Sequence, residues 1–140
     1  MAQVAQALRP EGRLFVHVFA HRDHAYPFLD RGRGDWMART FFTGGWMPSH
    51  GSLGEARGPL ASEAAWWVDG THYARTARAW LANLDREREA LRPVLEATYG
   101  AGSADRRHAD WRLFFLACEE LFAWRGGTTW GVSHRRFRVS

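Results

Sequence analysis

The amino-acid sequence predicts the C-terminal half of a doubly wound α/β sheet that is closed by an antiparallel strand. The apolar run 13–21 shows little alternation and follows a Pro-x-Gly turn, as a buried strand of a parallel sheet does. The expected order along the chain is helix, strand, helix, strand, two or three helices and a final strand. The final run, 128–139, alternates apolar and polar residues, which is typical of an antiparallel or edge strand.

The first expected helix, over residues 2–8, has no strand before it. Val4 and Leu8 lie on one helical face, and Arg9-Pro10-Glu11-Gly12 ends the helix. A lone helix–strand unit cannot cover both faces of its sheet, so we expect the chain to start in the middle of a fold. It would then be a truncated gene product, the product of a wrongly placed start, or one half of a split protein.

The middle of the chain is expected to hold a short helix, a second strand and a long helix. Asp35 can cap a helix over residues 36–41, and residues 63–68 are a strand candidate. Asp69-Gly70-Thr71 begins the long helix. Apolar residues at helical spacing predict its buried face: Tyr73, Ala77, Trp80, Leu81 and Leu84.

Pro93 interrupts the helical pattern, which resumes over residues 94–99. The last helix is expected from Ser103 to about Trp124, because Gly126-Gly127 stops it. Its apolar stripe consists of Trp111, Phe115, Cys118 and Phe122. The elements predict one α/β domain, or part of one, over residues 1–140.

The composition indicates a folded protein without disulfides. Hydrophobic residues make up 46% of the 140 residues, which is too many for a disordered chain. All 19 basic residues are arginines, and they are spread along the chain apart from Arg135, Arg136 and Arg138, so we expect no nucleic-acid partner. Cys118 is the only cysteine. Because no signal peptide or membrane-length apolar stretch is visible, we expect a cytoplasmic protein.

Three parts of the sequence together resemble one enzyme family. They are LRPEGRLFVHVFAHR, then WMARTFFTGGWMPS, and finally the pair VDGTHYARTARAWLANLD and WRLFFLACEELFAWRGGTTWGVSHRRF. In this order they resemble the C-terminal half of the cyclopropane-fatty-acyl-phospholipid synthase and coclaurine N-methyltransferase family. The stretch FFTGGWMPS looks most similar to the coclaurine N-methyltransferases.

The resemblance implies a class I, Rossmann-like methyltransferase that uses S-adenosyl-L-methionine. Such enzymes methylate a small amine or, in lipid metabolism, cyclopropanate the alkene of a phospholipid acyl chain. The family binds its cofactor at a Gly-rich loop after the first strand and at an acidic residue that ends the second. Neither feature is present, since Gly44-Gly45 and Gly126-Gly127 do not follow a strand and open a helix. We therefore expect no cofactor-binding residue and no activity of the isolated chain.

The resemblance assigns catalytic roles to His17 and Tyr73. In the cyclopropane synthases, the histidine that matches His17 helps to hold a bicarbonate that acts as a base, and Tyr73 matches a tyrosine of the same site. Both side chains can donate hydrogen bonds to one anion. Their glutamate partner would lie upstream of Met1. The alternatives are a core histidine satisfied by a neighbour and an ordinary core tyrosine.

The loop 41–49 is expected to shape the acceptor pocket, because paired glycines allow a close backbone approach. We place Phe42, Trp46 and Met47 against the substrate. The alternative is an ordinary turn with hydrophobic anchors. The segment 21–24, His-Arg-Asp-His, contains three candidate ligands, but no other cluster completes a site and we expect no metal.

A second hypothesis treats the chain as a non-catalytic module. It would bind a hydrophobic ligand, or pair with a second copy or with the missing N-terminal half, through surface that this half would have covered. This hypothesis predicts exposed apolar area on the strand from Leu14 to Phe19, together with self-association.

Overall fold

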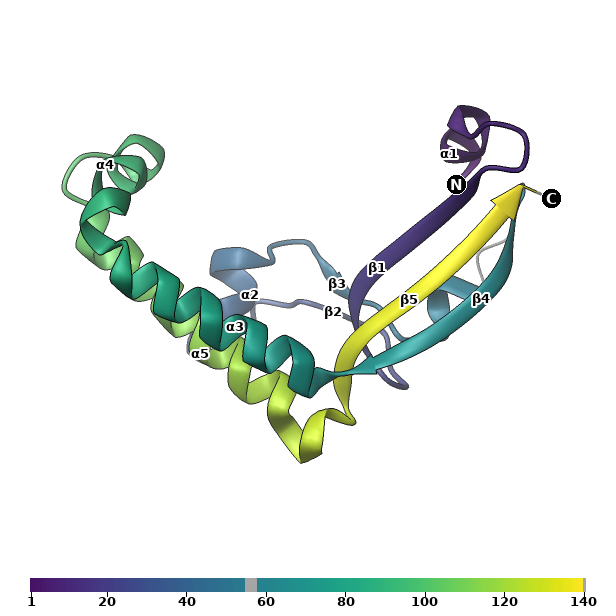
Figure 1. The fold of residues 1–140 in the computed structure, drawn as a ribbon. Helices are drawn as coiled ribbons and strands as arrows, with labels where there is room; N and C mark the ends of the chain where they lie inside the picture. Colours follow the sequence, from purple (N-terminus) through teal and green to yellow (C-terminus); the bar gives the residue numbers. More distant parts are fainter. Residues whose placement is uncertain (55–57, 140) are drawn as a thin grey trace.

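A three-stranded sheet and a long helical hairpin extend from a common junction, as the computed structural model shows (Figure 1). The structure describes residues 1–54 and 58–139. In chain order the elements are α1 (Ala2–Ala7), β1 (Arg13–His21), β2 (Tyr26–Pro27), α2 (Trp36–Phe41), β3 (Trp46–Met47), β4 (Leu60–Asp69), α3 (Gly70–Arg86), α4 (Arg88–Tyr99), α5 (Ala104–Gly127) and β5 (Trp130–Val139). No helix of the described ranges has the length and apolar character that a bilayer crossing requires.

The last strand, β5, lies between β1 and β4 and runs antiparallel to both. The predicted antiparallel orientation of this strand is therefore confirmed, and β1 and β4 run in the same direction. The helical hairpin returns the chain beside β4, so β5 fills the middle of the described sheet and is not at its edge (Figure 1). Strand β1 is an edge strand among the described residues.

The two faces of the sheet differ in how they are covered. On one face Ser133 and Arg135 are buried beneath residues 49–54. The other face, which we call the open face, carries Phe15, His17, Trp66 and His134. On this face Phe15 is 53% exposed and Trp66 is 41% exposed. Strand β1 is therefore not buried on both sides at Phe15 and His17, which are exposed.

The helical hairpin packs α3 against α5. The N-cap of α3 is Asp69, whose carboxylate accepts a hydrogen bond from the Thr71 N–H at 3.0 Å, as the sequence predicts. Small side chains let the two helices approach closely. The buried cluster between them consists of Ala74, Ala77, Cys118 and Phe122.

The boundary between α3 and α4 differs from the sequence prediction. The sequence predicts an interruption at Pro93, whereas the helical path breaks at Glu87 and Pro93 lies inside α4. The missing N–H of Pro93 deprives only the carbonyl of Glu89, an exposed residue, of its helical donor. Helix α5 ends as predicted, because the backbone leaves the helical conformation at Trp124.

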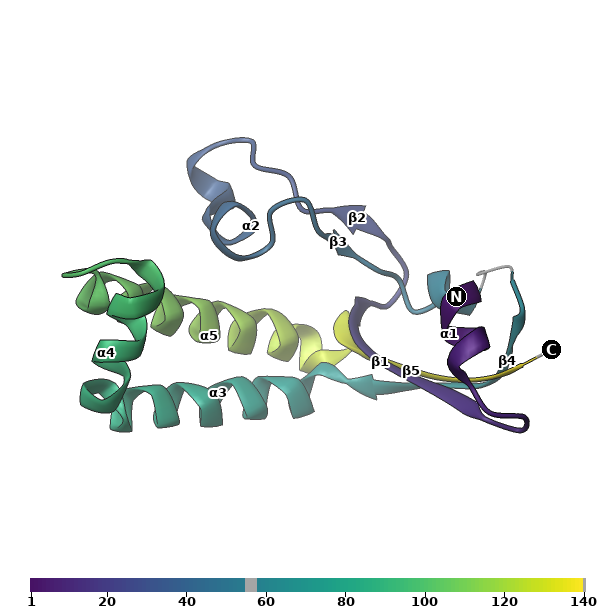
Figure 2. The ribbon, with the colours of Figure 1, turned by 90° about the horizontal axis from the view of Figure 1, so that it is seen from above.

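Residues 22–47 form a small unit on one side of the hairpin and the sheet (Figure 2). The sequence predicted only loop around the helix 36–41, whereas β2 and β3 pair antiparallel within the unit. Asp35 precedes α2 as predicted, but its side chain makes no capping bond to that helix. Its carboxylate instead accepts a hydrogen bond from the Arg31 N–H at 2.9 Å.

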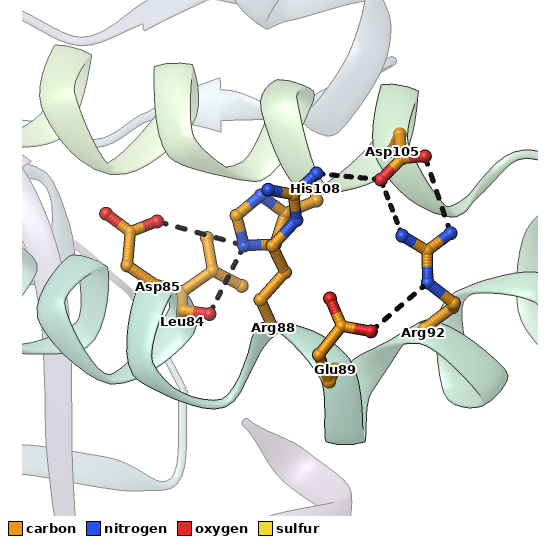
Figure 3. Close-up of polar contacts among 7 residues, drawn as sticks. All are labelled: Leu84, Asp85, Arg88, Glu89, Arg92, Asp105 and His108. Carbon is orange, nitrogen blue, oxygen red and sulfur yellow. Dashed lines mark hydrogen bonds and ion pairs between the residues drawn. The ribbon is translucent and has the colours of Figure 1, made fainter.

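Polar contacts tie α3, α4 and α5 together at the far end of the hairpin (Figure 3). Asp105 at the start of α5 accepts hydrogen bonds from Arg88 and Arg92 of α4, each at 2.9 Å. A ring nitrogen of His108 lies 3.2 Å from the carbonyl oxygen of Leu84 in α3. One carboxylate and one imidazole thus connect three helices.

We expect the variant Asp105→Asn to lower stability slightly at neutral pH and to have no effect in acid. Hydrogen bonds from Arg88 and Arg92 hold the pKa of the Asp105 carboxyl below its usual value. Its contribution is therefore present above the unfolded pKa and is lost as the pH falls through the folded pKa. Urea unfolding of both proteins at pH 7 and at about pH 3 checks this. An equal difference in urea midpoint at both pH values would contradict it.

Candidate functional site

A cavity of about 170 Å³ lies at the junction of the hairpin with the C-terminal end of β1. The small unit of residues 22–47, which Figure 2 shows on one side of the hairpin and the sheet, contributes lining residues to it. Twelve residues line it: Phe19, Tyr26, Phe28, Met37, Ala38, Phe42, Met47, Tyr73, Phe114, Cys118, Leu121 and Phe122. These residues belong to helices α2, α3 and α5 and to strands β1, β2 and β3, or directly follow one of these elements.

The loop 41–49 supports one wall of this cavity. The rings of Phe42 and Phe28 lie 4.9 Å apart, and Phe42 also faces Phe114 at 5.8 Å. A Cβ at Gly45 would lie 3.1 Å from a ring carbon of Phe28, so a side chain there would push that ring aside by a few tenths of an ångström. The absence of a side chain at Gly45 therefore lets the Phe28 ring lie against this turn.

The polar side-chain atoms of the lining belong to Tyr26, Tyr73 and Cys118. Burial raises the pKa of the Cys118 thiol to about 11, and burial also raises the pKa of Tyr73. The Cys118 thiol and the Tyr73 hydroxyl are therefore uncharged near neutral pH. The cavity suits a small, largely apolar molecule, and its aromatic faces can stabilise a positive charge.

Tyr26 is a lining residue that the sequence analysis missed. The Trp130 indole N–H donates a hydrogen bond to its hydroxyl oxygen at 2.9 Å. An indole nitrogen is only a donor, so the Tyr26 hydroxyl accepts here and keeps its own proton for another partner. Pairing of Tyr26 with Met47 joins β2 to β3. No local pattern signals this contact, because 104 residues separate Tyr26 from Trp130.

The structure brings three of the predicted site residues together, since Phe42, Met47 and Tyr73 all line the cavity. Trp46 does not line it. Its side chain is 63% exposed, because it alternates with Met47 along β3 and points to the other side.

His17 lies beside the cavity and not in its wall. It is on the open face of the sheet, where its Nδ1 lies 2.8 Å from Nε2 of His134. Phe19, two residues further along β1, lines the cavity, so one step of about 7 Å along the strand separates His17 from the wall. No hydrogen bond joins His17 to Tyr73 in the described part of the chain. Tyr73 packs against the Phe122 ring at 4.4 Å.

The ring of His21, the last residue of β1, stabilises the turn that follows this strand. Nδ1 of His21 accepts hydrogen bonds from the backbone N–H groups of Asp23 and His24, both at 3.0 Å. Within residues 1–54 and 58–139 no three side chains are grouped as a metal site requires.

A second polar cluster lies on the covered face of the sheet. Nδ1 of His50 is 2.9 Å from the hydroxyl of Ser133, and Arg135 donates to the carbonyl of His50 at 2.8 Å. A serine next to a histidine resembles a nucleophile with its base. Ser133 is fully buried, however, so no substrate can reach it and the cluster is structural.

Comparisons with known proteins identify relatives along almost the whole chain. No known family profile matches it. Over 99% of its length it is 27% identical to an (S)-coclaurine N-methyltransferase of Thalictrum flavum subsp. glaucum and 24% identical to one of Papaver somniferum. It is 26% identical to an (S)-tetrahydroprotoberberine N-methyltransferase of Eschscholzia californica. The chain spans about two fifths of the length of these relatives, at 39%, 40% and 40%.

Solved structures show the same likeness. A crystal structure of coclaurine N-methyltransferase bound to N-methylheliamine and SAH superimposes with a TM-score of 0.83 and 26% identity. It matches 96% of this chain and 41% of that one. A cyclopropane synthase from Mycobacterium tuberculosis gives a TM-score of 0.65 at 19% identity over 96% of this chain and 47% of its own, which bears on the fold alone. These likenesses confirm the predicted fold class.

Proposed function

Since this chain corresponds to the C-terminal half of the coclaurine N-methyltransferase and cyclopropane synthase family, we propose that it forms the acceptor-binding side of an S-adenosyl-L-methionine-dependent methyltransferase. The observation that carries the proposal is the aromatic cavity between α2, α3 and α5. No strand, Gly-rich loop and helix follow one another in the described residues as a nucleotide cradle requires. Under this proposal the chain supplies the acceptor side of the enzyme.

The cavity can prepare an acceptor nitrogen for methylation. An amine must lose its water and its proton before its lone pair can attack a methyl group. Side chains such as Phe42, Phe114 and Leu121 exclude water, and the aromatic rings stabilise the ammonium ion that forms. The hydroxyls of Tyr26 and Tyr73 orient the molecule through hydrogen bonds.

The proton that leaves the nitrogen needs an acceptor, and this is the role proposed for His17 and Tyr73. Tyr73 reaches the site from α3, and His17 lies one step along β1 from the wall. Together they would hold a bicarbonate that takes the proton, as the resemblance implies. The Tyr73 hydroxyl and a ring N–H of His17 would donate hydrogen bonds to the oxygens of this anion.

A small amine fits the cavity better than a phospholipid acyl chain. The volume of about 170 Å³ is below the range of roughly 300–1,000 Å³ that is usual for drug-sized ligands. The coclaurine N-methyltransferase with which the chain superimposes holds N-methylheliamine, an amine. The loop that carries Phe42 and Met47 is also the stretch whose sequence, FFTGGWMPS, resembles those enzymes.

Calorimetry on the purified chain tests the proposed function. We expect N-methylheliamine to bind, and S-adenosyl-L-methionine and phospholipid vesicles to give no heat. The variant Ala38→Phe should weaken amine binding by at least about tenfold, because the added ring occupies the cavity. Val94→Phe adds the same ring at an exposed position of α4 and is the control. Tight binding of S-adenosyl-L-methionine, or equal amine binding by both variants, would overturn the proposal.

The exposed aromatic residues of the open face favour a second function, a module that pairs with another polypeptide. Phe15 is 53% exposed on the edge strand β1, and Trp66 is 41% exposed on β4. Under this hypothesis the chain self-associates in sedimentation experiments as its concentration rises, and Phe15→Ser reduces the association. A strictly monomeric wild-type chain would exclude self-pairing.

A further inference from the structure

His134 is the residue that determines how His17 is presented. The two residues are directly opposite each other in β5 and β1. Nδ1 of His17 and Nε2 of His134 are 2.8 Å apart, and the ring centroids are 4.8 Å apart. A contact this short between neutral rings is a hydrogen bond, in which one nitrogen carries a proton and the other a lone pair.

Aromatic neighbours hold the His134 ring in place on the open face. Its centroid lies 5.1 Å from that of Phe15 in β1 and 5.5 Å from that of Trp66 in β4. The Trp66 ring meets it edge-on at 83°. Because strands on both sides contact the ring, its direction is fixed before anything binds to His17.

The hydrogen bond leaves His17 a single free nitrogen. His134 occupies Nδ1, so a molecule on the open face can meet only Nε2. If His134 donates, Nε2 of His17 must carry the proton and can donate to an anion. If His134 accepts, Nε2 has a lone pair and would repel an anion.

We propose that His134 is a positioning residue that donates its Nε2–H to Nδ1 of His17 and thereby makes His17 Nε2–H the donor to a bound bicarbonate. This inference rests on the proposed function, in which His17 helps to hold that anion. It concerns the tautomer of His17 and adds no group to the reaction itself.

The charged groups of the open face pair with one another and not with the two histidines. Arg13 of β1 and Arg136 of β5 are both paired with Glu63 of β4, at 3.0 Å and 2.6 Å. Burial and the neighbouring His17 lower the pKa of His134. His134 is therefore neutral around pH 7.5 and can be a single-proton donor.

Nitrogen-15 NMR of the histidine rings in the whole chain at about pH 8 tests the tautomer directly. In the wild type we expect His17 with its proton on Nε2. His134→Phe keeps a ring between Phe15 and Trp66 but has no donor, so His17 should become a mixture of tautomers. His134→Gln supplies an amide N–H and should restore the Nε2–H form. A proton on Nδ1 of His17 in the wild type, or an unchanged tautomer in His134→Phe, would overturn the proposal.

A bicarbonate titration of the same three proteins separates this inference from the proposed function. We expect His134→Phe to weaken bicarbonate binding roughly three- to tenfold, the effect of one hydrogen bond, and His134→Gln to recover it. If the tautomer changes as expected but no protein binds bicarbonate, the role of His134 stands and the proposed anion site at His17 fails. If binding changes without a change of tautomer, His134 does not act through His17.

Discussion

Gly70→Ala is expected to destabilise the chain by about 3 kcal/mol or more, because the helical hairpin can no longer join the sheet. A Cβ at Gly70 would collide with the backbone carbonyl oxygens of Phe122 and Trp130. These atoms belong to the last turns of α5 and to the start of β5. Backbone atoms cannot rotate away as a flexible side chain can, so β4, α5 and β5 would have to separate.

Urea unfolding followed by circular dichroism measures this loss for Gly70→Ala. Gly34→Ala is the control, because a Cβ at Gly34 meets nothing within 4 Å. We expect the control to stay within about 0.5 kcal/mol of the wild type. A Gly70→Ala protein as stable as this control would mean that β4, α5 and β5 do not meet as described.

Phe122→Ala should lower the free energy of unfolding by about 3–5 kcal/mol. Phe122 is 4% exposed and belongs to the buried cluster between α3 and α5. Its ring lies 4.4 Å from that of Tyr73 and also forms part of the cavity wall. Removing the ring leaves a void in the interior and enlarges the cavity, so the variant should lose both stability and selectivity for small ligands.

Leu116→Ala is the matched control for this prediction. Leu116 lies on the same helix but is 47% exposed, and its truncation should cost less than about 1 kcal/mol. Thermal and urea unfolding of the two variants compare the positions directly. Equal losses at Phe122 and Leu116 would show that the α3–α5 interface is not the core of the chain.

The sequence predicted the elements whose signals are local. Strand β1 begins and ends where its apolar run does, at residues 13 and 21. The Asp69 cap and the glycines that follow Trp124 mark the limits of the helical hairpin, and alternation identified the antiparallel β5. In each case neighbouring residues alone determine the backbone conformation.

The features that the sequence did not predict depend on residues far apart in the chain. His17 meets His134 across 117 positions, and the Trp130 bond to Tyr26 spans 104. The pairing of β2 with β3 and the central place of β5 are also long-range contacts. Periodicity contains no information about such partners, which explains why Tyr26 was missed.

The family resemblance contributed what local patterns could not. It placed Tyr73 at a catalytic site with His17, the sequence analysis placed the loop 41–49 at an acceptor pocket, and the structure brings Phe42, Met47 and Tyr73 to one cavity. The sequence analysis also placed Trp46 against the substrate, whereas alternation along the two-residue strand β3 turns it outward. The catalytic role of His17 stays a prediction, because it depends on what occupies the open face.

The most direct test of the acceptor cavity uses the three methionines of the chain. Met37 and Met47 line the cavity, whereas Met1 lies at the far end of the sheet (Figure 1). With carbon-13 labelled methionine methyl groups, addition of an aromatic tertiary amine should shift the NMR signals of Met37 and Met47 and leave that of Met1 unchanged. Unchanged signals of Met37 and Met47 at saturating amine would contradict an acceptor site between α2, α3 and α5.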